Sequence, residues 1–147
     1  MHVGSKNFIL MKVDDPYMSV NGVSQLVYPP AGGEEPRNTC PIVENGRTMV
    51  PIRAIIEAMG GRVDWDAADP DRIFLAASGH TVEMWLNTKN LIVDGDTKEM
   101  DIAPYTRNDR TLVPVRFAAE NTGCVVDWIQ STMQIVIVFY TGGSPIV

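Results

Sequence analysis

Basic residues and histidine are scarce in this chain, and their scarcity excludes several classes of protein. The 147 residues carry 12 Lys and Arg against 18 Asp and Glu, a formal net charge of −6. Nucleic acids and anionic membranes bind surfaces on which Lys and Arg are concentrated, so neither is an expected partner. The two histidines, His2 and His80, and the cysteines show no spacing typical of zinc or copper ligation. We therefore expect no transition-metal site and no cofactor.

Cysteine and long apolar runs are scarce as well. Cys40 and Cys124 are too few for a disulfide framework, although they leave a single bridge open. No segment approaches the ~20 consecutive apolar residues that a membrane-spanning helix needs, so no membrane span is expected. Residues 1–7 are too polar for a signal peptide. Either the chain stays in the cytoplasm, or it is a mature segment whose export signal has been removed.

Catalytic motifs are missing from the sequence too. It contains no Ser/His/Asp or Cys/His arrangement, no G-x-x-x-x-G-K-[ST] phosphate loop and no G-x-G-x-x-G after a strand. We therefore expect no enzyme activity and assign no catalytic residue. The acidic stretch from Asp64 to Asp71 offers oxygens that calcium could use, but it lacks the Gly and the terminal Glu of an EF-hand loop. A solvated acidic turn is the favoured interpretation.

What the sequence does contain is an internal repeat. The stretch from Asn45 to Trp65 returns as Asn108 to Trp128 in one gapless register, with the same residue at eleven positions: Asn, Arg, Thr, Val, Pro, Arg, Glu, Gly, Val, Asp and Trp. Each copy also begins with a hairpin, whose turn is Asn-Gly in the first copy and Asp-Gly in the second. The copies span residues 8–77 and 81–140, with tails at 1–7 and 141–147 and an insertion at about 24–38 in the first copy.

Each copy is predicted to fold as β-β-α-β-β, with one short helix packed on its own antiparallel sheet, so the fold class is α+β. Pro51 and Pro114 suit the first turn of a helix, and Gly60 and Gly123 suit a left-handed C-terminal cap. Between them, apolar residues recur at helical spacing, which predicts that one helix face is buried. A single copy is too small to bury a large core, so we expect the two to pack into one unit.

The repeated arginines have two possible interpretations. Arg53 lies four residues before Glu57, and Arg116 lies four residues before Glu120. Residues at this spacing share a helix face, so an ion pair that fixes the helix to its surroundings is the favoured interpretation. The alternative is an arginine that clamps an anionic ligand.

The tryptophans also have two interpretations. Trp65 and Trp128 occupy equivalent positions in the two copies, and Trp85 lies in the opening hairpin of the second copy. A core or half-core packing role is favoured over a surface on which sugar rings stack. The repeated residues are thus all assigned to a structural motif: Arg47, Thr48, Pro51, Arg53, Glu57, Gly60, Trp65, Arg110, Thr111, Pro114, Arg116, Glu120, Gly123 and Trp128.

The pattern Asn-Gly-Arg-Thr-x-Val-Pro-x-Arg, followed by an apolar helix, a glycine and Val-Asp-Trp, resembles the copper amine oxidase N-terminal-like domain, also called the stalk domain. The resemblance covers both copies and so nearly the whole chain. It implies a small antiparallel sheet wrapped on a helix, in a projecting stalk. In true amine oxidases, copper and the quinone belong to a separate catalytic domain, whose three histidine ligands and Asn-Tyr motif are missing here.

The resemblance further implies a non-catalytic structural or interaction module, in a stalk or spacer role, of an extracellular or cell-surface protein from a Gram-positive bacterium. Its expected partner is a protein or a cell-wall component. Two alternatives stay open. One is a module that binds cell-wall glycan or peptide through an aromatic face. The other is a self-assembling subunit, a homo-oligomer in which residues 8–13 and 134–140 are sheet edges that pair between chains.

Overall fold

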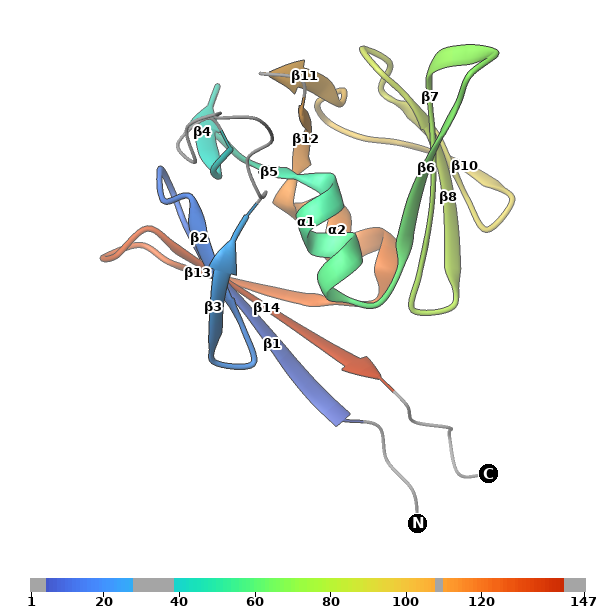
Figure 1. The fold of residues 1–147 in the computed structure, drawn as a ribbon. Helices are drawn as coiled ribbons and strands as arrows, with labels where there is room; N and C mark the ends of the chain where they lie inside the picture. The colour runs from blue at the N-terminus through green and yellow to red at the C-terminus, as the bar shows by residue number, and fades with distance from the viewer. Residues whose placement is uncertain (1–4, 28–38, 108–109, 142–147) are drawn as a thin grey trace.

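The computed structural model describes residues 5–27, 39–107 and 110–141 (Figure 1). These residues form strands connected mostly by tight turns, and two short helices. The elements in chain order are β1 (Ser5–Lys12), β2 (Tyr17–Val20), β3 (Val23–Leu26), β4 (Ile42–Glu44), β5 (Arg47–Pro51), α1 (Ile52–Ala58), β6 (Arg62–Asp66), β7 (Asp69–Ala77), β8 (His80–Trp85), β9 (Asn90–Val93), β10 (Asp96–Glu99), β11 (Tyr105–Arg107), β12 (Arg110–Pro114), α2 (Val115–Thr122), β13 (Val125–Ile129) and β14 (Gln134–Thr141).

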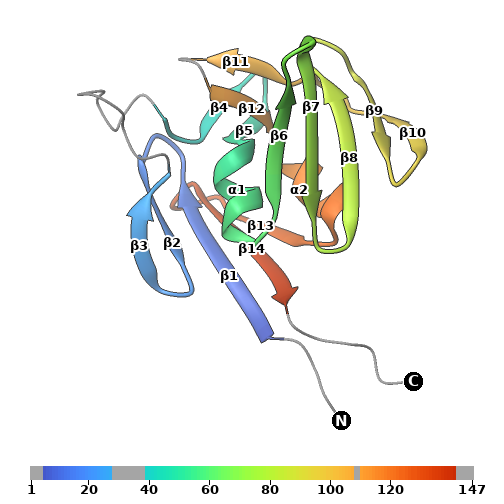
Figure 2. The same ribbon diagram turned by 45° about the vertical axis from the view of Figure 1, so that its right-hand side comes forward.

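The strands form three antiparallel sheets around the two helices. The first outer sheet has the order β13-β14-β1-β2-β3, and the second outer sheet has the order β10-β9-β8-β7-β6. A small sheet, β11-β12-β5-β4, covers a third side. Both views show α1 and α2 between these sheets (Figures 1 and 2). No helix in the described ranges is long and apolar enough to cross a membrane.

The predicted antiparallel sheets with short helices are confirmed, but the protein is mostly β and the sheets are shared differently. Each outer sheet combines three strands that open one copy with two strands that close the other. The reason is the turn after β7, where Ser78 and Gly79 have φ of 51° and 80°. Two successive positive φ values make a tight hairpin turn, so the last strand of the first copy pairs at once with the first strand of the second. The prediction that each copy has its own sheet is therefore wrong.

The two halves nevertheless correspond strand by strand. Ile73 of β7 lies opposite Met84 of β8, and the equivalent residues Ile135 of β14 and Met11 of β1 lie opposite each other. In the small sheet Val50 of β5 lies opposite Val113 of β12, its own equivalent in the repeat. An approximate two-fold axis therefore passes between β5 and β12.

The ends of the predicted copies need two corrections. Residues 5–7 and Thr141, expected in the tails, belong to β1 and β14, which pair along their full lengths. β1 and β14 are both interior strands of the first outer sheet, so the alternative in which residues 8–13 and 134–140 are sheet edges that pair between chains is wrong. Of the insertion expected at about 24–38, residues 24–26 belong to β3, and residues 28–38 lie outside the described ranges.

A single core fills the space between the sheets. It combines Ile55 and Ile56 of α1 with Phe117 of α2, and all three side chains are at most 2% exposed. Buried residues of both outer sheets, such as Ile9 and Leu75, belong to the same cluster. Because α1 and α2 are too short to be stable as isolated helices, burial in this shared core is what stabilises them.

Candidate functional site

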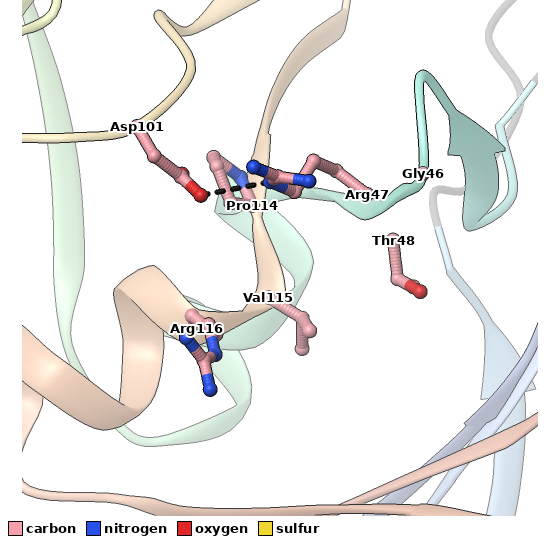
Figure 3. A pocket seen from close by; sticks show the side chains of 7 residues that line it. All are labelled: Gly46, Arg47, Thr48, Asp101, Pro114, Val115 and Arg116. Carbon is pink, nitrogen blue, oxygen red and sulfur yellow. Dashed lines mark hydrogen bonds and ion pairs between the residues drawn. The ribbon is translucent and has the colours of Figure 1, made fainter.

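A pocket at the small sheet brings together opposite ends of the two copies of the motif. It has a volume of about 420 Å³. The first copy contributes the beginning of its motif, and the second contributes the residues at which α2 begins. The pocket is lined by Gly46, Arg47, Thr48, Asp101, Pro114, Val115 and Arg116 (Figure 3). The sequence gave no sign that the two copies of the motif are in contact. The pairing of β5 with β12 brings them together.

Local backbone geometry positions these side chains. Asn45 and Gly46 have φ of 51° and 73°. These two positive φ values form the tight turn between β4 and β5, so Arg47 is the first residue of β5. On the other wall, Pro114 is the N-cap of α2, with φ of −58°. The sequence predicted Pro114 in the first turn of the helix, but it lies one residue earlier, at the end of β12, and the helix that begins after it places Arg116 in its first turn.

Two arginines and one carboxylate set the charge of the pocket. Nε of Arg47 donates a hydrogen bond to Oδ2 of Asp101 over 2.7 Å (Figure 3). This bond lowers the pKa of Asp101 below its ordinary value, and the charge of Arg116 acts in the same direction. Asp101 is therefore ionised at neutral pH and neutralises one of the two arginines. Among the ion pairs of the described residues none includes Arg116, which is exposed.

The equivalent arginine of the first copy has a different environment. The guanidinium of Arg53 lies 4.8 Å from the ring centroid of Trp65, a cation–π distance. Its Nε lies 3.9 Å from Oε1 of Glu57, so the expected ion pair is present but long. Both side chains are more than a third exposed, and such pairs contribute little stability. The anion-clamp interpretation thus has no support at Arg53, whereas Arg116 faces a pocket.

The tryptophans do not lie in the core. Trp65 and Trp128 expose 42% and 38% of their surface, and Trp85 is half-buried. Trp65 lies on β6 and Trp128 on β13, edge strands of the two different outer sheets. The two exposed rings therefore form no common aromatic platform, and the glycan-binding alternative loses its simplest geometry.

The motif that forms these helix and strand ends belongs to a known family. Residues 32–137 match the copper amine oxidase N-terminal domain family, which is most of the chain. The chain belongs to this family. No curated protein and no solved structure gave a match. The family predicted from the Arg-Thr-x-Val-Pro motif is thereby confirmed, and the N-terminal domain of copper amine oxidases is a non-catalytic domain.

In this copper amine oxidase N-terminal domain the remaining motif residues occupy helix and strand ends. Thr111 is buried and Thr48 half-buried on the two strands of the small sheet. Gly123 caps α2 with φ of 72°, as predicted for a left-handed cap. Gly60 has φ of 80° one residue beyond Met59, the C-cap of α1. Two further motif residues, Arg110 and Glu120, lie at the start of β12 and on α2.

The acidic stretch of the domain forms the turn between β6 and β7. Oδ1 of Asp66 accepts a hydrogen bond from the backbone of Ala68 over 2.9 Å. Its other carboxylate oxygen lies 3.5 Å from Arg72, and Asp64 pairs with Arg62. Within the described ranges no three His, Cys, Asp or Glu side chains are grouped so that they could hold a metal ion.

The cysteines of the domain are not joined to each other, and both carry thiols. Cys124 is buried, with Sγ 3.5 Å from Sδ of Met59 in the helix region of the other copy. Burial raises the pKa of both thiols, so neither is an activated nucleophile.

One site residue of the domain gave no signal in the sequence. Asp101 lies in the connection between β10 and β11, outside the repeated motif. Its partnership with Arg47 depends on how the two copies pack, so the motif alone could not reveal it.

Proposed function

We propose that this domain is a non-catalytic interaction module of a secreted or cell-surface bacterial protein, attached to that protein at one point. The observation that carries the proposal is the pairing of β1 with β14, which places Ser5 opposite Thr141 (Figure 1). Segments that continue from these two residues start at neighbouring positions. A spacer that lengthens a chain needs its ends far apart. A domain with neighbouring ends instead branches off the rest of the parent protein, so that its surfaces are accessible to partners.

Energy transfer between two fluorescent proteins, fused before Ser5 and after Thr141, tests the attachment. We expect efficient transfer in the folded domain, because the two fusion points lie on paired strands. Unfolding in urea is the internal control, since the ends of an unfolded chain separate. Transfer that is weak in the folded state and does not fall on unfolding would show that the domain acts as a spacer.

The cellular location is tested separately in a Gram-positive host that produces the parent protein. If the domain is exported, protease added to intact cells will degrade it while a cytoplasmic marker survives. Protection of the domain in intact cells, lost only on lysis, would contradict export without affecting the attachment geometry.

A second candidate function, binding of a carboxylate-bearing cell-wall peptide, is favoured by the pocket around Arg116. Arg116 faces the pocket without an ion pair among the described residues, and a guanidinium binds a carboxylate through two parallel hydrogen bonds. Titration with an acetylated dipeptide, followed by nuclear magnetic resonance, tests it. Arg116→Gln should abolish the shifts, whereas the matched variant Arg53→Gln should retain them. Equal loss in both variants, or no shifts in the parent chain, would contradict this function.

A further inference from the structure

β13 is an edge strand of the first outer sheet, and one side of its backbone faces no other strand. It pairs with β14 on the other side, in an unbroken register from Val125 to Ile129. Alternate residues of such a strand direct their N–H and C=O groups away from the paired neighbour. Within the described ranges no hydrogen bond reaches these outward groups of β13. A row of unpaired donors and acceptors is a template for one further extended strand.

The equivalent edge of the second outer sheet, β6, is protected. Its Arg62 and Asp64 form an ion pair, with Nε and Oδ2 3.4 Å apart, so charged side chains occupy this edge. The register of β6 also shifts between its last two residues, and a bulge of this kind interrupts regular pairing along an edge. β13 has neither feature, because its register is unbroken and because Val125 and Ile129 stand where β6 has its first and last charged residues.

The side chains of β13 define which kind of strand fits beside it. Val126 packs against the core. The alternation of a strand therefore places Val125, Asp127 and Ile129 together on the outer side of the sheet. Val125 and Ile129 expose 55% and 38% of their surface. Asp127 is exposed and belongs to none of the ion pairs of the described residues, whereas its equivalent in β6 is paired. A carboxylate between two apolar side chains matches a basic residue between two apolar residues on the neighbouring strand.

We propose that the β13 edge binds an extended segment of another protein with the pattern apolar-x-basic-x-apolar, which joins the first outer sheet as an antiparallel strand. The basic residue of this segment pairs with Asp127, and its two apolar residues lie opposite Val125 and Ile129. The antiparallel direction continues the pattern of the sheet. Backbone hydrogen bonds supply the affinity, and the alternating side chains supply the selectivity. This binding mode rests on the interaction role proposed above, for which it supplies the class of partner.

A synthetic peptide tests the edge. The probe is the acetylated and amidated heptapeptide Thr-Val-Thr-Lys-Thr-Val-Thr, added to the chain at up to about 1 mM, where a weak association is visible. Hydrogen exchange of the outward amides of residues 125–129 should slow at least ~3-fold when most of the chain is bound. N-methylation of one alternate set of peptide amides should abolish binding, because these amides donate to β13. Methylation of the other set, which faces solvent, should preserve it.

Variants of the chain test the charge. Asp127→Lys should abolish binding of the Lys peptide and allow binding of the matched peptide with Glu in its place, because the pair is re-formed with reversed signs. Val125→Arg introduces the residue that β6 has at this position, gives Asp127 a partner within the chain and should weaken binding at least ~10-fold. Asp64→Lys, the same change on β6, should leave binding unaltered. Circular dichroism establishes that the variants fold.

Several outcomes would overturn this binding mode. They are the absence of binding at about 1 mM, equal affinity for the Lys and Glu peptides, and equal affinity for the two methylated peptides. Outward amides of β13 that are already protected in the free chain would also overturn it. Protection lost on dilution would show that a second copy occupies the edge, and protection unchanged by dilution would show that another part of the chain does. Arg116→Gln should leave peptide binding unaltered, so these results do not bear on the pocket, the attachment or the export proposed above.

Discussion

At the scale of single residues, Gly61 shows what sequence comparison alone misses. The equivalent residue in the second copy is Cys124, so the repeat gives no reason for a glycine. The structure gives one, because a Cβ at position 61 would lie 2.9 Å from Cβ of Ala77 and meet the carbonyl oxygen of Ala76 even more closely. The C-terminal end of α1 approaches β7 too closely for any side chain. Packing distances of this kind depend on the whole fold and leave no local signal.

Gly61→Ala should therefore destabilise the domain by about 2 kcal/mol, the usual cost of overfilling a packed site. The backbone at Gly61 does not have positive φ, so the effect comes from the steric clash and not from the conformation of the residue. Urea unfolding measures the change in free energy of unfolding. Cys124→Ala, at the equivalent position, is the matched control that removes atoms instead of adding one. A Gly61→Ala variant as stable as the parent chain would contradict the close approach.

The turn residue Asp94 predicts a dependence of stability on pH. Hydrogen bonds from His80 and from the backbone of Thr81 lower the pKa of Asp94 in the folded state. A lowered folded pKa gives stability that is present above the unfolded pKa, near 4, and that is lost as the pH falls through the folded pKa. The first half uses Asn21 at this position, and its Oδ1 accepts the equivalent bond from the backbone of Phe8.

Asp94→Asn should accordingly flatten the loss of stability between about pH 6 and pH 2, because asparagine accepts the backbone bond without titrating. The midpoint of urea unfolding, measured across this range for the parent and the variant, provides the test. His80→Ala removes the side-chain donor to Asp94 and should reduce the slope in part. Identical slopes in all three proteins would contradict the assignment to Asp94.

At the scale of elements, the sequence predicted the hairpins and helices well because local signals define them. The Asn-Gly and Asp-Gly turns form as expected, and Gly60 and Gly123 have positive φ at the helix ends. The prolines were expected in the first turn of each helix, but they are the N-caps, one residue earlier. The pairing of β14 with β1 left no such signal, because it joins the two ends of the described chain. Residues of β14 are apolar on both faces, a pattern that suits an interior strand as well as an edge.

The edges of the small sheet meet through residues that are equivalent in the repeat. Glu44 of β4 and Arg107 of β11 occupy the same repeat position, and Nη1 of Arg107 lies 3.4 Å from Oε2 of Glu44. Identical residues here would place like charges together at the two-fold axis. The same carboxylate accepts a hydrogen bond from the hydroxyl of Tyr105 over 2.7 Å. Because the two copies differ at this position, opposite charges meet where identical charged residues would repel.

Glu44→Gln should lower the pKa of Tyr105, which burial and then the bond to Glu44 raise to about 12. The pKa should fall toward the ordinary value near 10 without reaching it, since burial remains. Ultraviolet titration of the tyrosines measures this change. Tyr105→Phe identifies the transition of Tyr105 among those of the other tyrosines. A titration curve that Glu44→Gln leaves unchanged would contradict the contact between the two sheet edges.

At the scale of the whole molecule, the repeat explains why the sheets are shared and why the sequence could not show it. The strand pairs β7–β8 and β14–β1 have the same register, although only the first pair is connected by a turn. If each copy instead paired its own last strand with its own first strand, it would contain the same strands, turns and buried positions. The sequence pattern is therefore equally compatible with both arrangements, and only the short connection after β7 decides between them.

This equivalence predicts that the chain tolerates circular permutation. Phe139 and Asn7 lie opposite each other as Ala77 and His80 do, so an Asn-Gly turn can join them as Ser78-Gly79 joins the other pair. Opening the chain at Ser78-Gly79 then creates new ends at the corresponding place. The permuted protein should keep the far-ultraviolet spectrum and lie within about 2 kcal/mol of the parent in free energy of unfolding, because no core contact changes.

The same opening without the new turn gives two fragments, whose association should depend on concentration. A permuted chain that fails to fold, while these fragments assemble, would show that the two strand pairs are not interchangeable.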